Sequence, residues 1–211
     1  MKFLGILISL IVFLASIGHL LAEGNPYWSL KIGYAHSDWA QDIGSPDGAV
    51  GSIAVGWRAK TQLINLRSDF EIAGYFLADN RSHENPGVVA RYESKQRYRQ
   101  LVGSYIANLY IDFMERNAFR PYAGFGVGVM WIDHHGSVRE TRSQVFGPTV
   151  NTGYDVGGNY RTLFFEPKIG FLVSDPNGMV SGDFSLHFAR PIINDDKFLM
   201  FSIRLGTISN F

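Results

Sequence analysis

Two carboxylates spaced two residues apart are the first candidates for chemistry in this chain. Asp69 and Glu71 alternate with apolar residues. In a β-strand their side chains would point to the same face, where one could donate a proton and the other accept one. Arg67 belongs to that face as well, and a ladder of salt bridges explains the three residues more simply than an acid and base pair. We therefore interpret them as structural.

Histidines are the other candidates for catalysis or metal binding. His187 would act as a base on a neighbouring serine if a carboxylate oriented it. The next residue on its strand face is Ala189, which has no hydroxyl group. His134 and His135 are adjacent, so in a strand they would point to opposite faces and make a poor metal chelate. From these patterns we expect no catalytic residue, no metal and no cofactor.

Composition narrows the function further. The chain has 211 residues, 19 of them basic and 19 acidic, and no cysteine. Thiol catalysis and cysteine-ligated metals are therefore excluded, and the balanced charge gives no indication of nucleic-acid binding. Residues 3–17 form an apolar run behind Lys2, which is typical of a secretory signal peptide. We expect cleavage after Ala22, with Gly18 as the alternative, so that residues 1–22 are the signal peptide and residues 23–211 one domain.

The elements that carry these residues have a period of two, as strands do. Apolar or small residues recur at odd positions from Leu101 to Phe113, and from Ala123 to Trp131 they alternate with glycines. Each of these two segments has the roughly 9–11 residues that a tilted strand needs to cross a bilayer. The same alternation, with no helical periodicity between its occurrences, predicts eight strands at 27–37, 49–58, 66–76, 101–113, 123–131, 162–173, 180–188 and 201–206.

The connections between these segments alternate in length. Long polar connections follow the first, third and fifth segments, at 38–47, 79–97 and 133–159, and a moderate one follows the seventh. Short turns follow the second, fourth and sixth segments. Outer-membrane barrels show this asymmetry, and their closure removes unpaired strand edges. We predict an all-β fold, an eight-stranded antiparallel up-and-down transmembrane β-barrel with long external loops and short periplasmic turns. The alternative is a soluble lipocalin-like barrel, whose apolar face would point inward.

If the apolar faces meet lipid, charged residues line the lumen. A barrel of this size has an interior that side chains fill, so we expect a salt-bridge network rather than a conducting pore or proton path. Gly124, Gly126 and Gly128 would give room to long arginine side chains, and Pro167 would cause a local bulge. The expected lumen network consists of Lys31, Arg58, Arg67, Asp69, Glu71, Asp112, Glu166, Lys168, Asp183 and Arg204.

Aromatic residues fall near both ends of the predicted strands, as expected for the two interfaces of a bilayer. The turn-end belt would contain Tyr27, Trp28, Trp57, Phe119, Tyr122 and Phe211. The loop-end belt would contain Trp39, Phe76, Tyr98, Trp131, Tyr160, Phe188 and Phe198. Aromatic residues in the loops are the candidates for binding a ligand, although they could also pack within their own loops: Trp39, Tyr92, Phe146 and Tyr154.

One stretch resembles a known family. The sequence NAFRPYAGFGVGVMWID, residues 117–133, is similar to the fifth strand of the outer-membrane β-barrel superfamily that includes opacity-type adhesins and the membrane domain of the outer-membrane protein A group. Phe211 is similar to the carboxy-terminal aromatic residue that the barrel-assembly machinery recognises in such proteins. Thr207 and Ser209 depart from the hydrophobic residues that the family often has before it.

This resemblance implies a location in a bacterial outer membrane, in contact with its lipid and lipopolysaccharide and with loops facing the exterior. It implies a non-enzymatic surface protein that acts in adhesion, through a host or extracellular ligand, or in envelope integrity. The alternative within the same superfamily is a lipid A-modifying enzyme of the deacylase kind, with a serine and histidine pair near the outer rim.

Overall fold

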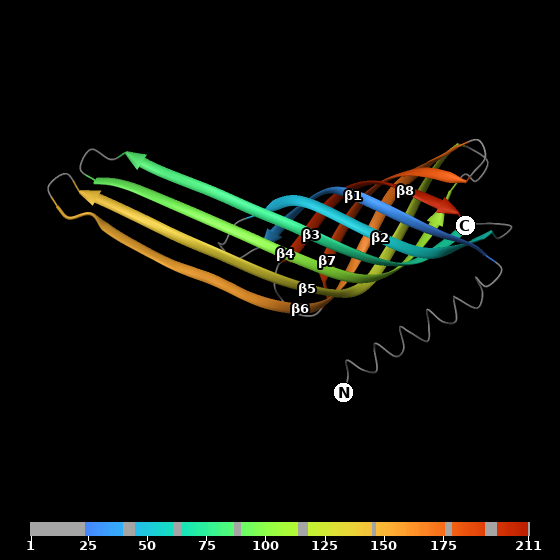
Figure 1. Ribbon diagram of the computed structural model, residues 1–211, viewed down its shortest axis with the longest axis horizontal. Helices are drawn as coiled ribbons and strands as arrows, with labels where there is room; N and C mark the ends of the chain where they lie inside the picture. The colour runs from blue at the N-terminus through green and yellow to red at the C-terminus, as the bar shows by residue number, and fades with distance from the viewer. Residues whose placement is uncertain are drawn as a thin grey trace, which may run out of the picture.

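Eight antiparallel strands form a closed barrel in the computed structural model. The structure describes residues 24–39, 45–60, 65–86, 90–113, 118–144, 147–175, 179–192 and 198–210. Each strand pairs with the next, and β8 pairs with β1 (Figure 1). Within the described ranges there is no helix of the length and apolarity that a membrane span needs. The strands are β1 (Asn25–Trp39), β2 (Asp47–Lys60), β3 (Asn65–Pro86), β4 (Ala90–Asp112), β5 (Phe119–Gln144), β6 (Val150–Ser174), β7 (Val180–Pro191) and β8 (Phe198–Asn210).

The barrel wall is apolar outside and largely polar inside, which confirms the predicted fold. Ile32, Phe70 and Leu205 on the outer surface are 69%, 53% and 57% exposed. Side chains of the other parity, such as Glu71 and Arg204, are buried. A soluble barrel would have the reverse arrangement.

Four strands continue far beyond the barrel, where the sequence analysis placed loops. Pairing between β3 and β4 continues to Pro86 and Arg91, and pairing between β5 and β6 continues to Arg142 and Val150. The prediction of irregular loops at 79–97 and 133–159 is therefore wrong for most of their length. Residues 79–86, 90–99, 133–144 and 150–161 form one four-stranded sheet, the projecting sheet, which extends to one side in Figure 1. At about 3.3 Å per residue, it reaches about 25 Å along β3 and about 40 Å along β5.

Three layers of side chains fill the barrel. An apolar layer lies in the half next to the projecting sheet, the charged layer lies in the middle, and a layer rich in tyrosine lies near the short turns. The apolar layer includes Val102, Ile106, Met130, Ile132 and Phe164. These residues share the parity of the charged ones, so parity places them in the lumen, but an expectation of charged lumen residues did not include them.

The glycine row of β5 makes room for residues other than arginine. A Cβ atom at Gly124 would collide with the ring of Tyr110, and one at Gly126 with Asn108. At Gly128 the nearest side chain is Phe164. The predicted role of the row in accommodating arginines is therefore wrong.

The aromatic belts are correct for the tryptophans and phenylalanines whose side chains the structure describes, such as Phe76, Phe119 and Phe188, but wrong for the buried tyrosines. The side chains of Trp39 and Phe198 and the whole of Phe211 lie outside the described part of the chain. Trp57 and Trp131 lie on the outer surface, 41% and 38% exposed, whereas Tyr27, Tyr98 and Tyr122 are buried. A buried phenol needs a hydrogen-bond partner, and the polar lumen supplies the carboxylates of Asp69 to Tyr27 and of Asp183 to Tyr122.

Pro167 does not cause a bulge. Partner positions in β6 and β7 follow the same register on both sides of it, from Phe165 with Arg190 to Lys168 with His187. The residues between them lack partners in β7, because proline has no backbone N–H to donate.

Candidate functional site

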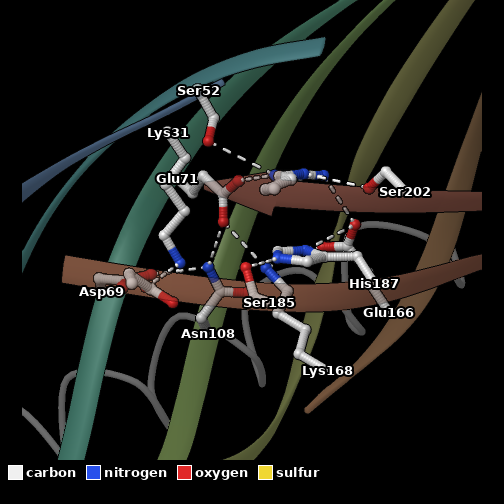
Figure 2. A network of polar contacts seen from close by, with 12 residues as sticks. Lys31, Ser52, Asp69, Glu71, Asn108, Glu166, Lys168, Ser185, His187 and Ser202 are labelled. Carbon is white, nitrogen blue, oxygen red and sulfur yellow. Dashed lines mark hydrogen bonds and ion pairs between the residues drawn. The ribbon is translucent and has the colours of Figure 1, made fainter. Parts of the chain in front are cut away.

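Glu71 is at the centre of the charged layer (Figure 2). Its carboxylate accepts a hydrogen bond from Lys168 Nζ at 2.9 Å and one from Asn108 Nδ2 at 3.0 Å. Its other oxygen pairs with the guanidinium of Arg204. Two cations from β6 and β8 therefore converge on a single carboxylate of β3.

Glu166 closes the same cluster from the other side. Its carboxylate lies 2.8 Å from Lys168 Nζ and 3.2 Å from Arg204 Nη2. Arg204 also donates to the hydroxyl of Tyr75 at 2.5 Å and to Ser202 Oγ at 3.1 Å. The two positive charges of Lys168 and Arg204 balance the two negative charges of Glu71 and Glu166, and all four side chains are fully buried.

Two further ion pairs lie nearer the short turns. Lys31 Nζ is 2.7 Å from Asp183 Oδ2, and Tyr122 donates to the same carboxylate at 2.7 Å. Arg67 Nε is 2.8 Å from Asp112 Oδ1. The Arg67 guanidinium also lies 4.6 Å from the ring centroid of Tyr122, where the ring face attracts a cation.

Two of the ten predicted network residues are placed differently. Asp69 has hydrogen bonds from Tyr27, at 2.8 Å, and from Asn108, at 2.6 Å, in place of a cation. No carboxylate of the described residues lies within ion-pair distance of Arg58, whose guanidinium is 5.9 Å from the Tyr27 ring centroid. The lumen tyrosines are the part of this arrangement that the sequence analysis missed. Their parity, which they share with the charged residues, was the signal that could have revealed them.

The structure also brings a serine to His187. Ser185 Oγ lies 2.9 Å from His187 Nε2, and His187 Nδ1 lies 3.4 Å from Glu166 Oε1. A catalytic serine would be expected at position 189, which is alanine, but Ser185 supplies the hydroxyl from the other side of His187 on the same strand face. Serine, histidine and carboxylate follow one another in the order of a hydrolytic triad. All three side chains are buried, and the apolar layer lies between them and the projecting sheet.

The projecting sheet has two faces. The lumen-side face continues the interior of the barrel and has Tyr92, Val138 and Tyr154, while the outward face continues the lipid-facing surface. Tyr154 is 61% exposed. Tyr92 is part-buried, and its hydrogen bond with Glu140 raises the pKa of the phenol.

The four predicted ligand-binding residues are not gathered in one place. Tyr92 and Tyr154 share the lumen-side face of the projecting sheet, whereas Trp39 is the last residue of β1. Phe146 lies outside the described residues, as do Phe211 and the predicted signal peptide at 1–22.

His134 is a titratable group at the junction of the barrel and the projecting sheet. Its ring stacks on Tyr160, with the centroids 5.2 Å apart. Burial, followed by the nearby charge of His135, lowers the pKa of His134. Within the described ranges, no group of three or more histidines and carboxylates is arranged to hold a metal ion.

Comparison with known proteins identifies the fold. No protein-family model and no curated protein matches the chain. Neisserial surface protein A is a similar solved structure, with a TM-score of 0.51 and 15% identity over 88% of this chain and 97% of that chain. The attachment invasion locus protein Ail of Yersinia pestis has a TM-score of 0.39 and 17% identity over 89% and 99% of the two chains. The outer membrane enzyme PagL has a TM-score of 0.40 and 12% identity over 86% and 99%. At 15% identity the likeness to Neisserial surface protein A concerns the fold alone.

Proposed function

We propose that this protein is a non-enzymatic surface protein of a bacterial outer membrane and binds an extracellular or host ligand through the projecting sheet. The observation that carries the proposal is the sheet itself, which continues four of the eight strands far past the apolar surface. A barrel needs no such extension to cross a bilayer, for which about 9–11 residues per strand suffice.

The proposed orientation puts the projecting sheet outside the cell and the short turns in the periplasm. Outer-membrane barrels have short periplasmic turns and longer external segments. The outer rows of Ile32, Phe70 and Leu205 would then contact lipid and lipopolysaccharide. Phe211 would serve as the residue that the barrel-assembly machinery recognises, and residues 1–22 as the signal peptide that directs export.

The lumen-side face of the projecting sheet is the proposed contact surface. Val138 and Tyr154 are directly opposite each other on β5 and β6, and Tyr92 lies on the same face of β4. Tyrosine gives a large contact area for a small loss of side-chain entropy, which makes it a frequent anchor at binding surfaces. Since the sheet is held by four paired strands, little backbone ordering is needed when a ligand binds.

In-register shortening of both hairpins tests the proposal. Asn80 pairs with Arg97, and Val138 pairs with Tyr154, so two-residue turns can replace 81–96 and 139–153 without changing the barrel. Cells that produce the full-length protein should adhere to surfaces coated with extracellular-matrix extract, and cells that produce the shortened protein should not, while heat-dependent gel mobility shows a folded barrel. The double substitution Tyr92→Ala and Tyr154→Ala should weaken adhesion in the full-length sheet. Unchanged adhesion of the shortened protein would exclude the sheet as the contact site.

The barrel could also support the integrity of the envelope, a role that would not require the projecting sheet. Cells that lack the protein would then become sensitive to detergent, and the shortened protein would restore resistance. If only the full-length protein restores resistance, the projecting sheet takes part in that role too.

A lipid A-modifying enzyme is the alternative, and the contacts of His187 with Ser185 and Glu166 are the observation in its favour. Against it, the same carboxylate binds Lys168 and Arg204, and the group lies inside the barrel, away from lipid. Mass spectra of lipid A from cells with and without the protein should therefore be identical. Loss of an acyl chain that depends on His187 would contradict the proposed function.

A further inference from the structure

Glycines from three neighbouring strands lie side by side on the lipid-facing surface. Gly51 of β2 pairs with Gly74 of β3, which pairs with Gly103 of β4. A Cβ atom at Gly51 or Gly74 would have no other atom within 4 Å, and the indole of Trp131 covers Gly103. The barrel surface is therefore hollowed here, where neighbouring rows carry large side chains.

The three glycines form the floor of an open groove of about 1530 Å³. Its walls are apolar and include Ile32, Ile72, Phe76, Leu101 and Trp131. All of these side chains belong to the outer surface of the barrel and are at least one-third exposed. In shape and polarity the groove suits an extended hydrocarbon chain.

Polar groups stand at the end of this groove next to the projecting sheet. Asp133, Asn159 and Arg161 line that end, and Arg161 pairs with Trp131 across the sheet. The Asp133 carboxylate is 3.1 Å from His135 Nε2, so its contact is with a residue of the same strand, β5.

A second cavity of about 590 Å³ follows on the outward face of the projecting sheet. It is lined by Arg97, Arg99, His135 and Asp155, among others. Arg99 is two residues from Leu101 of the groove, and His135 is two residues from Asp133. Same-face residues two apart are about 7 Å from each other, so the two cavities form a continuous strip from apolar to basic.

The arginines of this strip differ from Arg81 and Arg91 of the projecting sheet. Arg81 and Arg91 have carboxylate partners in Asp79 and Glu84. Within the described ranges, no carboxylate lies within ion-pair distance of the three arginines of the strip. Three arginines against two carboxylates leave the strip with excess positive charge. The arginines of the strip are Arg97, Arg99 and Arg161.

We propose that this strip is a binding site for one phosphorylated glycolipid of the outer leaflet. An acyl chain lies in the glycine-floored groove, and phosphate groups bind Arg99 and Arg161. Guanidinium groups bind phosphate through paired, charge-assisted hydrogen bonds, which are strong where lipid excludes water. The proposal rests on the orientation given under the proposed function, because that orientation puts the basic end of the strip at the height of the outer-leaflet headgroups.

Native mass spectrometry of the full chain in mild detergent tests the site, with diphosphoryl lipid A as the probe. Gly51→Leu with Gly74→Leu fills the floor of the groove, and Gly182→Leu is the matched control. Gly182 is exposed on β7, and a Cβ there makes only an ordinary contact, 3.8 Å from the Val173 carbonyl oxygen. The wild type and the control should each retain one lipid A, and the double leucine variant should bind it at least about tenfold more weakly.

The headgroup end is tested in the same way. Arg99→Gln with Arg161→Gln should weaken binding of diphosphoryl lipid A about tenfold or more, and Arg190→Gln, exposed on β7, should not. Dephosphorylated lipid A should bind to the wild type as weakly as diphosphoryl lipid A binds to the Arg99 and Arg161 variant. Inorganic phosphate at millimolar concentration should not displace the lipid.

Three results would overturn the proposal. Equal retention of phosphatidylethanolamine would make the groove a general lipid surface. Displacement by inorganic phosphate would reduce the site to an anion site without a lipid. A change from dimer to monomer in the Gly51 and Gly74 variant, with no lipid A bound to the wild type, would assign the groove to a second copy of the chain. The protein with shortened hairpins keeps the arginines of the strip. It should therefore still bind lipid A even though it no longer supports adhesion, so the two proposals can fail independently.

Discussion

Neutralising Glu71 should destabilise the barrel more than any single change on its surface. Glu71→Gln keeps the shape of the side chain and removes its charge. Lys168, 2.9 Å away, and Arg204 would then depend on the Glu166 carboxylate alone. Removing one partner of a buried ion pair leaves an uncompensated buried charge, which costs about 3–5 kcal/mol. We expect a loss of that size in the free energy of unfolding.

Urea titration of the protein in lipid vesicles, followed by tryptophan fluorescence, measures this loss. Glu84→Gln is the control, because Glu84 pairs with Arg91 on the exposed hairpin, where such pairs contribute below about 1 kcal/mol. Adding Arg204→Gln to Glu71→Gln should recover part of the loss, since it removes the cation left without a partner. A loss no larger than that of the control would refute the idea that this layer stabilises the barrel.

Two other positions give sharp expectations. Gly126→Val should lower the free energy of unfolding by about 1–3 kcal/mol or more, because its side chain would collide with Asn108 and Ile106. Gly74→Val should change the free energy of unfolding by under about 0.5 kcal/mol, and equal effects of the two substitutions would contradict the inward and outward assignment of the two glycines. Burial lowers the pKa of His134 in the folded state, so the unfolded state binds more protons as the pH falls. The melting temperature should therefore be highest above about pH 6.5 and decrease as the pH falls below that value. If a His134→Gln variant loses as much thermal stability on acidification as the wild type, His134 is not the cause.

The period of two was enough to predict the barrel but not the extent of its strands. Inside the membrane segment one face meets lipid, so residues such as Phe70 and Ile72 mark the strand by alternation with Asp69 and Glu71. In the projecting sheet both faces are largely polar, and the alternation disappears although the pairing continues. The polar, glycine-rich sequence of these segments therefore led to the prediction of loops.

The sequence could predict which residues form the charged layer, but it could not predict which of them form ion pairs with one another. Parity alone puts Lys168, Arg204 and Glu71 in the lumen, but which cation meets which carboxylate depends on the stagger between strands that are distant in sequence. The buried tyrosines illustrate the same limit. A bilayer interface and a polar lumen both suit a phenol, and for Tyr27 and Tyr122 only their parity separates the two environments.

The uneven length of the strands leaves the projecting sheet with two borders that no described strand covers. Pairing of β2 with β3 ends at Ala78, and pairing of β7 with β6 begins at Phe164. Beyond these residues no described strand pairs with the edge of β3 at 79–86 or with the edge of β6 at 150–159. On β3 this border has Arg81, Glu84 and Pro86, which discourage another strand from pairing with it. The border of β6 at 150–159 lacks proline and has Asp155 as its one charged residue, so it is the side on which an extended peptide could add a fifth strand.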